Sequence, residues 1–259
     1  MPLVSPEIFA KQKIAALQDY SLLSWRAVTN IFSRPRYWPD IFTQMDYIGF
    51  GSLPIVVLTG FFTGCVLALQ SATSLQQFGA VSMTGNLVAL SMVKELGPVL
   101  TGLMLSGRNA SGMASELGSM KVTEQIDAMR ALGTDPIRKL VTPRLYATVF
   151  MLFFLTIIAD VVGIAGGAIV SVGLLGLSPS SYLHNSYRAL VYGDVVQGLA
   201  KPIFSGFIIA TVGCYFGLKT KGGTQGVGRS TTQAVVVSSV FIIIVDFIVS
   251  RAMIGIFGR

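Results

Sequence analysis

The chain has 259 residues, of which 52% are hydrophobic and only 12% are charged, and its mean hydropathy is +0.68. A soluble globular domain carries about 25% charged residues, so this composition argues against an ordinary soluble enzyme. The 28 glycines are also more typical of membrane helices. The net charge of +7 comes from basic residues that lie between apolar runs, which favours membrane topology over a nucleic-acid-binding patch.

The residues that build metal centres and disulfides are scarce. Cys65 and Cys214 both lie inside apolar runs, and His184 is the one histidine of the chain. These numbers exclude a disulfide framework and a zinc site. No short apolar core follows the basic residues near the N-terminus, so we expect no cleavable signal there.

Residues 1–46 are predicted to contain an amphipathic helix. Their apolar side chains recur at helical spacing and share one face, and Trp and Tyr residues that favour the headgroup layer follow them. We interpret the segment as an interfacial helix on the cytoplasmic leaflet. The alternative is a short helix packed against the underside of the bundle. The apolar face comprises Ile14, Leu17, Trp25, Val28 and Phe32.

Residues 47–259 are predicted to form a membrane domain with five transmembrane helices. Each apolar run is long enough for the roughly 20 residues that a span needs. A polar turn over residues 70–85 joins the first two spans. The expected spans are 47–69, about 86–107, a stretch within 145–177, about 202–218 and 231–250.

Two sequence features predict how these spans bend and pack. Pro54 and Pro98 lie inside spans and predict kinks or short breaks. Small residues four apart allow helix backbones to approach closely in lipid. The pairs with this spacing are Gly60 and Gly64, Gly163 and Gly167, and Gly213 and Gly217.

The distribution of basic residues predicts the orientation. Most lysines and arginines lie before span one, after span two and after span four, on one side of the membrane. By the positive-inside rule that side is cytoplasmic. We therefore expect an all-α integral membrane protein with a cytoplasmic N-terminus and a C-terminus on the opposite side of the membrane.

Charged residues inside spans are costly and usually face a cavity or a partner. Lys94 and Glu95 are adjacent, so they do not face each other on a helix. A break near Gly97 and Pro98 beside a polar cavity would accommodate both charges. We interpret the pair as part of a pathway that meets a polar headgroup, and burial between neighbouring helices is the alternative.

Two aspartates are further candidates inside the spans. Asp246 is expected to form an ion pair, with Arg251 five residues further on as its partner. Asp160 is a candidate for a proton relay or for a structural ion pair.

The segment Gly223 to Ser230 nearly matches a phosphate-binding loop, with Arg229 where that motif has Lys. The motif requires a preceding core strand and a following soluble helix, whereas this segment joins two predicted spans. We therefore expect no nucleotide binding, and we interpret the segment as a flexible cytoplasmic turn.

A short cytoplasmic helix is predicted over about 121–133. Thr123 suits its N-cap and Gly133 its C-terminal stop. Ile126 and Met129 share one face at helical spacing. Such a helix either docks a partner or packs against its own spans.

The sequence around this helix contains a dense set of short motifs. They are the runs Glu95-Leu-Gly-Pro-Val99, Gly107-Arg108, Ala114-Ser-Glu116-Leu-Gly118-Ser-Met120, Val122-Thr-Glu124-Gln125-Ile-Asp127-Ala128-Met129, Gly133-Thr-Asp135-Pro136 and Pro143-Arg144. With these motifs the chain resembles the MlaE/YrbE family of ABC-transporter permeases. The resemblance is dense over residues 94–147, and the five-span layout extends it to nearly the whole chain.

The resemblance implies a homodimeric permease in the inner membrane of a diderm bacterium. It implies an ATPase subunit that binds ATP and Mg, so that this chain holds no cofactor and is not itself an enzyme. It also implies a periplasmic ring of MCE-domain proteins, in some members a STAS-domain subunit, and phospholipid movement between two membranes that maintains outer-membrane lipid asymmetry.

The resemblance further implies two groups of site residues. Lys94 and Glu95, with Lys where the family more often has Arg, are expected beside a lipid cavity. The full cavity set is Lys94, Glu95, Leu67, Leu69 and Arg229, and the expected ATPase contacts are Glu124, Gln125, Asp127, Met129 and Arg130.

Two other functions remain open at this stage. An ion- or proton-coupled carrier would use Asp160 and Asp246 and would work without an ATPase. A membrane scaffold that only anchors its partners would tolerate mutations in the spans.

Overall fold

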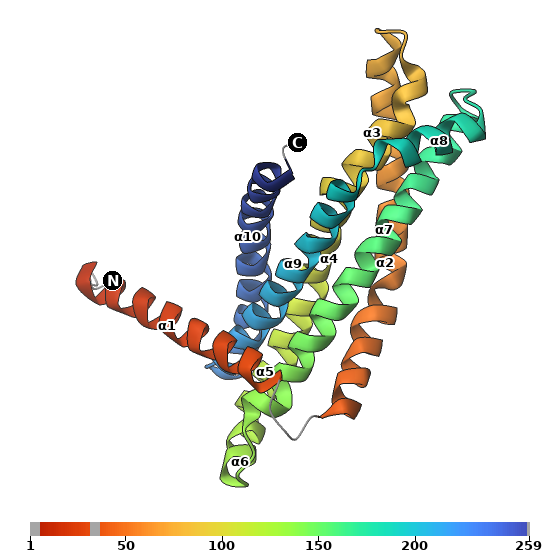
Figure 1. The fold of residues 1–259 in the computed structure, drawn as a ribbon. Coiled ribbons are helices and arrows are strands. Elements are labelled where there is room, and N and C mark those ends of the chain that lie inside the picture. Colours follow the sequence, from red (N-terminus) through yellow and green to blue (C-terminus); the bar gives the residue numbers. More distant parts are fainter. Residues whose placement is uncertain (1–5, 32–36, 258–259) are drawn as a thin grey trace.

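The computed structural model describes residues 6–31 and 37–257, and within these ranges every regular element is helical (Figure 1). Five helical stretches are long and apolar enough to cross a membrane. This confirms the predicted all-α membrane protein with five spans. The stretches are Trp38–Gln76, Val81–Val122, Ile137–Gly173, Tyr192–Leu218 and Gly223–Gly255.

The helices follow one another with short connections, and the second and third spans each combine several of them. In chain order they are α1 (Pro6–Ile31), α2 (Trp38–Gln76), η1 (Val81–Met83), α3 (Thr84–Ser91), η2 (Met92–Leu96), α4 (Gly97–Leu105), η3 (Ser106–Ala110), α5 (Ser111–Val122), α6 (Gln125–Ala131), η4 (Ile137–Val141), α7 (Thr142–Gly173), α8 (Pro179–Ala189), α9 (Tyr192–Leu218) and α10 (Gly223–Phe257).

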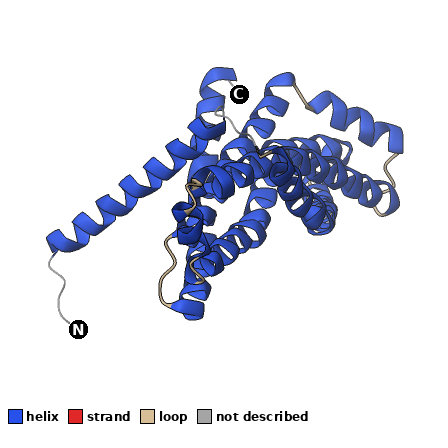
Figure 2. Cartoon of the chain, turned by 90° about the horizontal axis from the view of Figure 1, so that it is seen from below, coloured by secondary structure: helices blue, strands red, loops and turns tan. Residues whose placement is uncertain are grey.

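The spans run side by side, and the short helices mark the two ends of the bundle (Figure 1). The first end carries α6 and the start of α2, and we call it the α6 end. The opposite end carries α8 and the turn after α2, and we call it the α8 end. Helix α1 crosses the bundle obliquely near the α6 end and extends away from it (Figures 1 and 2).

Helix α1 packs on the bundle through its middle and its C-terminal half, and the Tyr215 hydroxyl of α9 donates to the carbonyl of Ala16 at 3.1 Å. Ala27 is fully buried, and the Tyr20 hydroxyl lies 2.8 Å from Thr211 Oγ1 on α9. On the predicted apolar face, Ile14 and Trp25 are more than 60% exposed, whereas Val28 packs against the core. Phe32 lies outside the described residues. The helix thus combines a docked face with an exposed apolar face, and its place at a membrane surface stays a prediction.

The closest approach of two spans is made by α2 and α7 through glycines. A Cβ at Gly64 would lie 1.8 Å from the carbonyl oxygen of Gly163, and one at Gly60 would lie 2.9 Å from that of Ala159. Gly217 likewise packs against Ala114 of α5. The predicted close packing at these glycines is confirmed, because a side chain at Gly64 has no room.

The second span contains the predicted break. The chain forms a π-helical turn over Met92–Leu96, directly before Gly97 and Pro98, and a second one over Ser106–Ala110. By contrast, α2 continues without a break through Pro54. The π-turns were not predicted, because they are set by the partners of the displaced backbone groups rather than by local sequence.

Three sequence boundaries were wrong. The polar stretch 70–85 is mostly helical, since α2 extends to Gln76 through residues that include no glycine or proline. Helix α9 begins at Tyr192, so Lys201 lies inside the span and not in an outer loop. The glycine-rich segment is also helical from Gly223, where Gly222 and Gly223 supply the turn with positive φ.

Gly64→Ala is expected to destabilise the fold by roughly 1–3 kcal/mol, because its methyl group overpacks the contact between α2 and α7. The check is a thermal unfolding curve of the purified protein in detergent. Gly228→Ala is the matched control, since a Cβ there meets nothing within 4 Å. Equal midpoints for the two variants would contradict the close packing.

Candidate functional site

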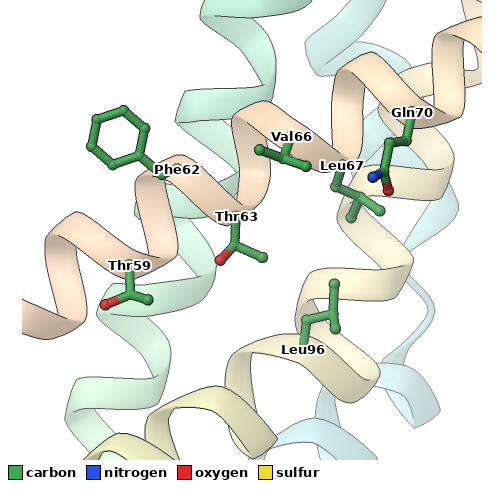
Figure 3. Close-up of a pocket in the computed structure, with 7 residues that line it drawn as sticks. All are labelled: Thr59, Phe62, Thr63, Val66, Leu67, Gln70 and Leu96. Atoms are coloured by element: carbon green, nitrogen blue, oxygen red, sulfur yellow. The ribbon is translucent and has the colours of Figure 1, made fainter.

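A pocket open to one side lies between α2 and η2 and has a volume of about 330 Å³ (Figure 3). Its α2 residues follow helical spacing, so they form one stripe, and Leu96 of η2 faces them across the pocket. The surface is apolar apart from two hydroxyls and one amide. The lining residues are Thr59, Phe62, Thr63, Val66, Leu67, Gln70 and Leu96.

Lys201 of α9 carries a buried ammonium group that contacts η2, the helix that contributes Leu96 to the pocket. Its side chain is 1% exposed and forms ion pairs with Glu95 at 2.5 Å and with Asp246 of α10 at 3.1 Å. It also donates a hydrogen bond to the backbone carbonyl of Lys94 at 2.7 Å. An ammonium has three donors, and these three acceptors use all of them. The desolvation cost of the buried charge is thereby offset.

Pro98 explains why the carbonyl of Lys94 is available. In an α-helix this carbonyl would accept the N–H of the residue four positions later, and Pro98 has no N–H. Lys201 supplies the missing donor from a neighbouring span. The π-turn, the proline and the buried lysine therefore form one structural unit.

Lys94 and Glu95 point to different partners, as expected for adjacent helical residues. Lys94 forms an ion pair with Asp194 of α9 at 3.0 Å, and the Asp194 side chain is 8% exposed. Glu95 faces Lys201 and also accepts a hydrogen bond from Ser250 at 3.2 Å. Lys94 is thus paired with α9, and Glu95 is paired with α9 and α10. Neither of these two side chains lines the pocket between α2 and η2.

Sequence reasoning missed Asp194 and Lys201 as members of this cluster. A signal was present, since Asp194, Gln197, Lys201 and Ser205 recur every three or four residues and all are buried. A polar stripe along one helix face predicts partners on neighbouring helices. The predicted pairing of Asp246 with Arg251 was wrong, because Asp246 pairs with Lys201.

The remaining predicted cavity residues are separated by the fold. Leu67 lines the pocket, whereas Leu69 does not and is 42% exposed. Arg229 is exposed near the start of α10. At a rise of about 1.5 Å per residue it lies about 25 Å from the level of Asp246. The structure does not bring Arg229 to the cluster around Glu95.

Asp160 is buried in α7 and lies against Gly97, directly after the π-turn. A Cβ at Gly97 would lie 1.7 Å from Asp160 Oδ1. That oxygen has no hydrogen-bond partner among the described residues. The carboxyl group therefore requires a glycine at position 97.

The predicted cytoplasmic helix is found as α6 (Gln125–Ala131), which projects from the α6 end of the bundle (Figure 1). Thr123 is not its N-cap, which is a correction. Its hydroxyl donates back to the carbonyl of Ser119 at 2.9 Å, and the turn is made by Glu124 with a φ of 58°. Gly133 has a φ of +77° and ends the helix as predicted.

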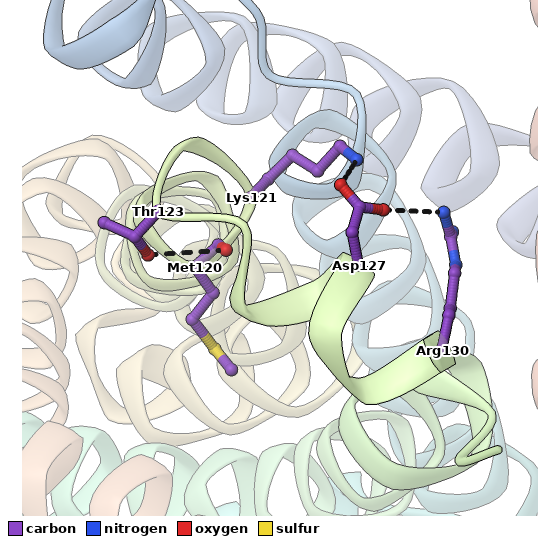
Figure 4. Close-up of polar contacts among 5 residues, drawn as sticks. All are labelled: Met120, Lys121, Thr123, Asp127 and Arg130. Carbon is purple, nitrogen blue, oxygen red and sulfur yellow. Dashed lines mark hydrogen bonds and ion pairs between the residues drawn. The ribbon is translucent and has the colours of Figure 1, made fainter. Parts of the chain in front are cut away.

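Asp127 fixes α6 to α5. Its carboxylate forms ion pairs with Lys121 at 2.6 Å and with Arg130 at 3.2 Å (Figure 4). The hydrogen bond from Lys121 is the main reason that the pKa of Asp127 lies below its ordinary range. These contacts are therefore present at neutral pH and are lost only as the pH falls below about 4.

Helix α6 has one buried face and one exposed tip. Ile126 is fully buried, and Met129 packs partly against the core. At the tip, Leu132 is 83% exposed, a large apolar side chain that the sequence analysis did not include. An exposed leucine next to Arg130 is typical of a docking surface.

Lys201→Met is expected to destabilise the protein by about 3–5 kcal/mol, because it leaves two carboxylates facing each other without their cation. Adding Asp246→Asn is expected to restore part of the loss by removing one negative charge. The check is denaturant unfolding in detergent. Lys219→Met is the control, since its ion pair with Asp19 is half-exposed and contributes about 0–1 kcal/mol. Equal losses for both lysines would contradict this role of Lys201.

Comparison with known proteins places the chain in a family. Residues 41–252 match the family described as "Permease MlaE". A "Probable ABC transporter permease protein" of Rickettsia bellii is 44% identical over 91% of each chain. The "Intermembrane phospholipid transport system permease protein MlaE" of Haemophilus influenzae is 34% identical over 85% of each chain. "Protein TRIGALACTOSYLDIACYLGLYCEROL 1, chloroplastic" of Arabidopsis thaliana is 37% identical over 88% of this chain and 65% of its own.

The family match covers the three middle spans in full and nearly all of the first and last, and it includes the π-turn, the buried lysine and α6. The chain therefore belongs to the MlaE family of ABC-transporter permeases.

Proposed function

We propose that this chain is the permease subunit of an ABC transporter that moves phospholipids between the inner and outer membranes of a diderm bacterium. One observation carries the proposal: this chain of the MlaE family has an open apolar pocket between α2 and η2, and η2 also belongs to a cluster of ion-paired charges. Apolar walls suit acyl chains, and the charges suit a headgroup. The H. influenzae relative named for phospholipid transport supports the substrate class.

The pocket of one chain suits a homodimer. Phe62 and Val66 of α2 line it and are each at least 50% exposed. In a pair of chains these faces would meet around a shared cavity, with acyl chains in contact with Leu67 and Leu96. We place Lys94 and Glu95 at the headgroup level of that cavity.

The α6 end is proposed to face the cytoplasm and an ATPase subunit that binds ATP and Mg. Three exposed features support this orientation: the ion-paired α6, the apolar tip at Leu132, and Glu124 with Gln125 at the turn. The α8 end would then face the periplasm and a ring of MCE-domain proteins. A STAS-domain subunit would belong on the ATPase.

An ion-coupled carrier is the second candidate, and it is favoured by Asp160 Oδ1, which has no hydrogen-bond partner among the described residues. Asp246, the other aspartate of that hypothesis, is held by Lys201 at 3.1 Å. A tagged pull-down from mild detergent, followed by mass spectrometry of proteins and lipids, separates the two functions. We expect an ATPase, an MCE protein and phospholipid, whereas recovery of the chain alone would favour the carrier.

Leu67→Trp is expected to reduce the amount of copurified phospholipid and the transport rate several-fold, because the indole fills the pocket. Leu69→Trp is the matched control, since the same substitution two residues away lies outside the lining. Lys94→Ala and Glu95→Ala are expected to reduce both quantities as well. Unchanged lipid occupancy and transport in all three site variants would refute the cavity assignment.

Leu132→Asp and Arg130→Glu are expected to weaken copurification of the ATPase, since they alter the exposed tip and side of α6. Lipid binding should persist, because both residues lie far from the pocket. Leu174→Asp, at a similarly exposed leucine near the α8 end, is the control. ATPase recovery that is equal in all variants would show that α6 is not the docking element.

A further inference from the structure

A second pocket lies at the α6 end and is separate from the one between α2 and η2. It is open, has a volume of about 200 Å³, and lies between the start of α2, α5, η4 and the first turn of α7. Its polar lining includes Asp40 and Gln44 of α2, Glu116 of α5, Lys139 of η4 and Arg144 of α7. None of these residues lines the pocket between α2 and η2, which we call the transport pocket, and none belongs to the exposed tip of α6.

The charges around this second pocket balance. Lys139 pairs with Asp40 at 2.5 Å, and Arg144 pairs with Glu116 at 2.8 Å. Two acids and two bases face a small cavity, so an anion alone gains no net attraction there. A ligand that carries one positive and one negative charge can pair with both kinds of group.

These ion pairs leave hydrogen-bonding capacity unused. Within residues 6–31 and 37–257, Lys139 Nζ makes one hydrogen bond and lies over the Tyr37 ring, 4.3 Å from its centroid, so one of its three donors remains for a ligand. Only one oxygen of Asp40 and one of Glu116 are engaged there. Arg144 is 5% exposed at its side chain, and its Nε has no partner among the same residues. A ligand can therefore bind without breaking either pair.

The pocket lies at the depth of lipid headgroups. Arg144 directly precedes the apolar run that begins at Leu145, and Gln44 lies three residues before Tyr47, where the first apolar run begins. The headgroup regions add about 10–15 Å in total to the hydrocarbon core. Tyr47 and Phe50 continue from the pocket along α2 and are 54% and 75% exposed, which leaves an apolar surface for an acyl chain.

We propose that this pocket binds the zwitterionic phosphoethanolamine group, with the phosphate at Lys139 and the ammonium at the free oxygens of Asp40 and Glu116. The Gln44 amide is placed to donate to the phosphate. The volume fits a phosphate with a short amino alcohol, since a water molecule occupies about 30 Å³. The site is distinct from the transport pocket and does not rest on the transport function.

The walls of this headgroup pocket connect it to α6. Glu116 lies on α5, which leads into α6, and Lys139 lies on η4, which leads out of it. A headgroup bound to both residues ties the two connections of α6 to the start of α2. The lipid would therefore restrain the projecting helix.

The test uses the full chain in nanodiscs of phosphatidylethanolamine and phosphatidylglycerol. A phosphatidylethanolamine probe with a photoreactive group near the glycerol end of one acyl chain should label peptides within 38–50 and 139–150. Lys139→Gln and Glu116→Gln are each expected to reduce this labelling about tenfold, because each variant loses one charge-assisted hydrogen bond to the headgroup. Lys219→Gln, which removes the half-exposed pair with Asp19 at the same end, should leave it unchanged.

The competitors distinguish a lipid from a soluble ligand. If labelling persists in the presence of soluble phosphoethanolamine, the ligand is the lipid. If soluble phosphoethanolamine displaces the probe, the ligand is the soluble compound, and the pocket recognises it through the same ammonium and phosphate groups. Displacement by inorganic phosphate, equal labelling by a phosphatidylglycerol probe, or full labelling in Lys139→Gln would overturn the proposal. Labelling of Leu67 peptides in the same sample reports the transport pocket independently.

Discussion

The interaction on which the centre of the bundle depends is the saturation of one buried ammonium. Lys201 donates to the carbonyl that Pro98 leaves without a helical partner, and also to the carboxylates of Glu95 and Asp246. A lysine in an apolar interior is costly unless it is fully paired. Because its acceptors lie on η2 and α10, while Lys201 lies on α9, the lysine fixes three spans at one level. The π-turn at Met92–Leu96 is the backbone geometry that presents the two acceptors on η2, the carbonyl of Lys94 and the carboxylate of Glu95.

The glycine contact between α2 and α7 complements this polar centre. In lipid, helices gain little from the hydrophobic effect, so close backbone packing and interhelical hydrogen bonds hold them together. Gly60 and Gly64 allow α2 to lie directly on α7. One face of α2 is thereby fixed, and the stripe through Phe62 and Val66 remains exposed on another. The contact of Gly60 and Gly64 with α7 fixes the position of α2, so the residues of α2 that line the pocket can stay exposed.

The sequence was sufficient for features that depend on local pattern. Apolar runs predicted all five spans, glycine spacing predicted the contact at Gly64, and Gly133 predicted the end of α6. Features that depend on distant partners were missed. Lys201 was assigned to a loop because hydropathy falls near Asp194 and Lys201, although their charges are neutralised by residues far apart in the chain. Thr123 suited an N-cap, but its hydroxyl bonds backwards to Ser119.

The same contrast explains which site residues the fold brings together. Leu67 and Leu69 looked equivalent in the sequence, yet a rotation of about 200° between them places only Leu67 in the pocket. Lys94 and Glu95 were recognised as unusual, but their partners on α9 and α10 decide where they point. Arg229 carries the same charge as Lys94 but lies near the start of α10, far from the level of Asp246. Residue type indicates which side chains belong to a membrane site, and the helix rotation together with distant ion pairs determines which of them meet.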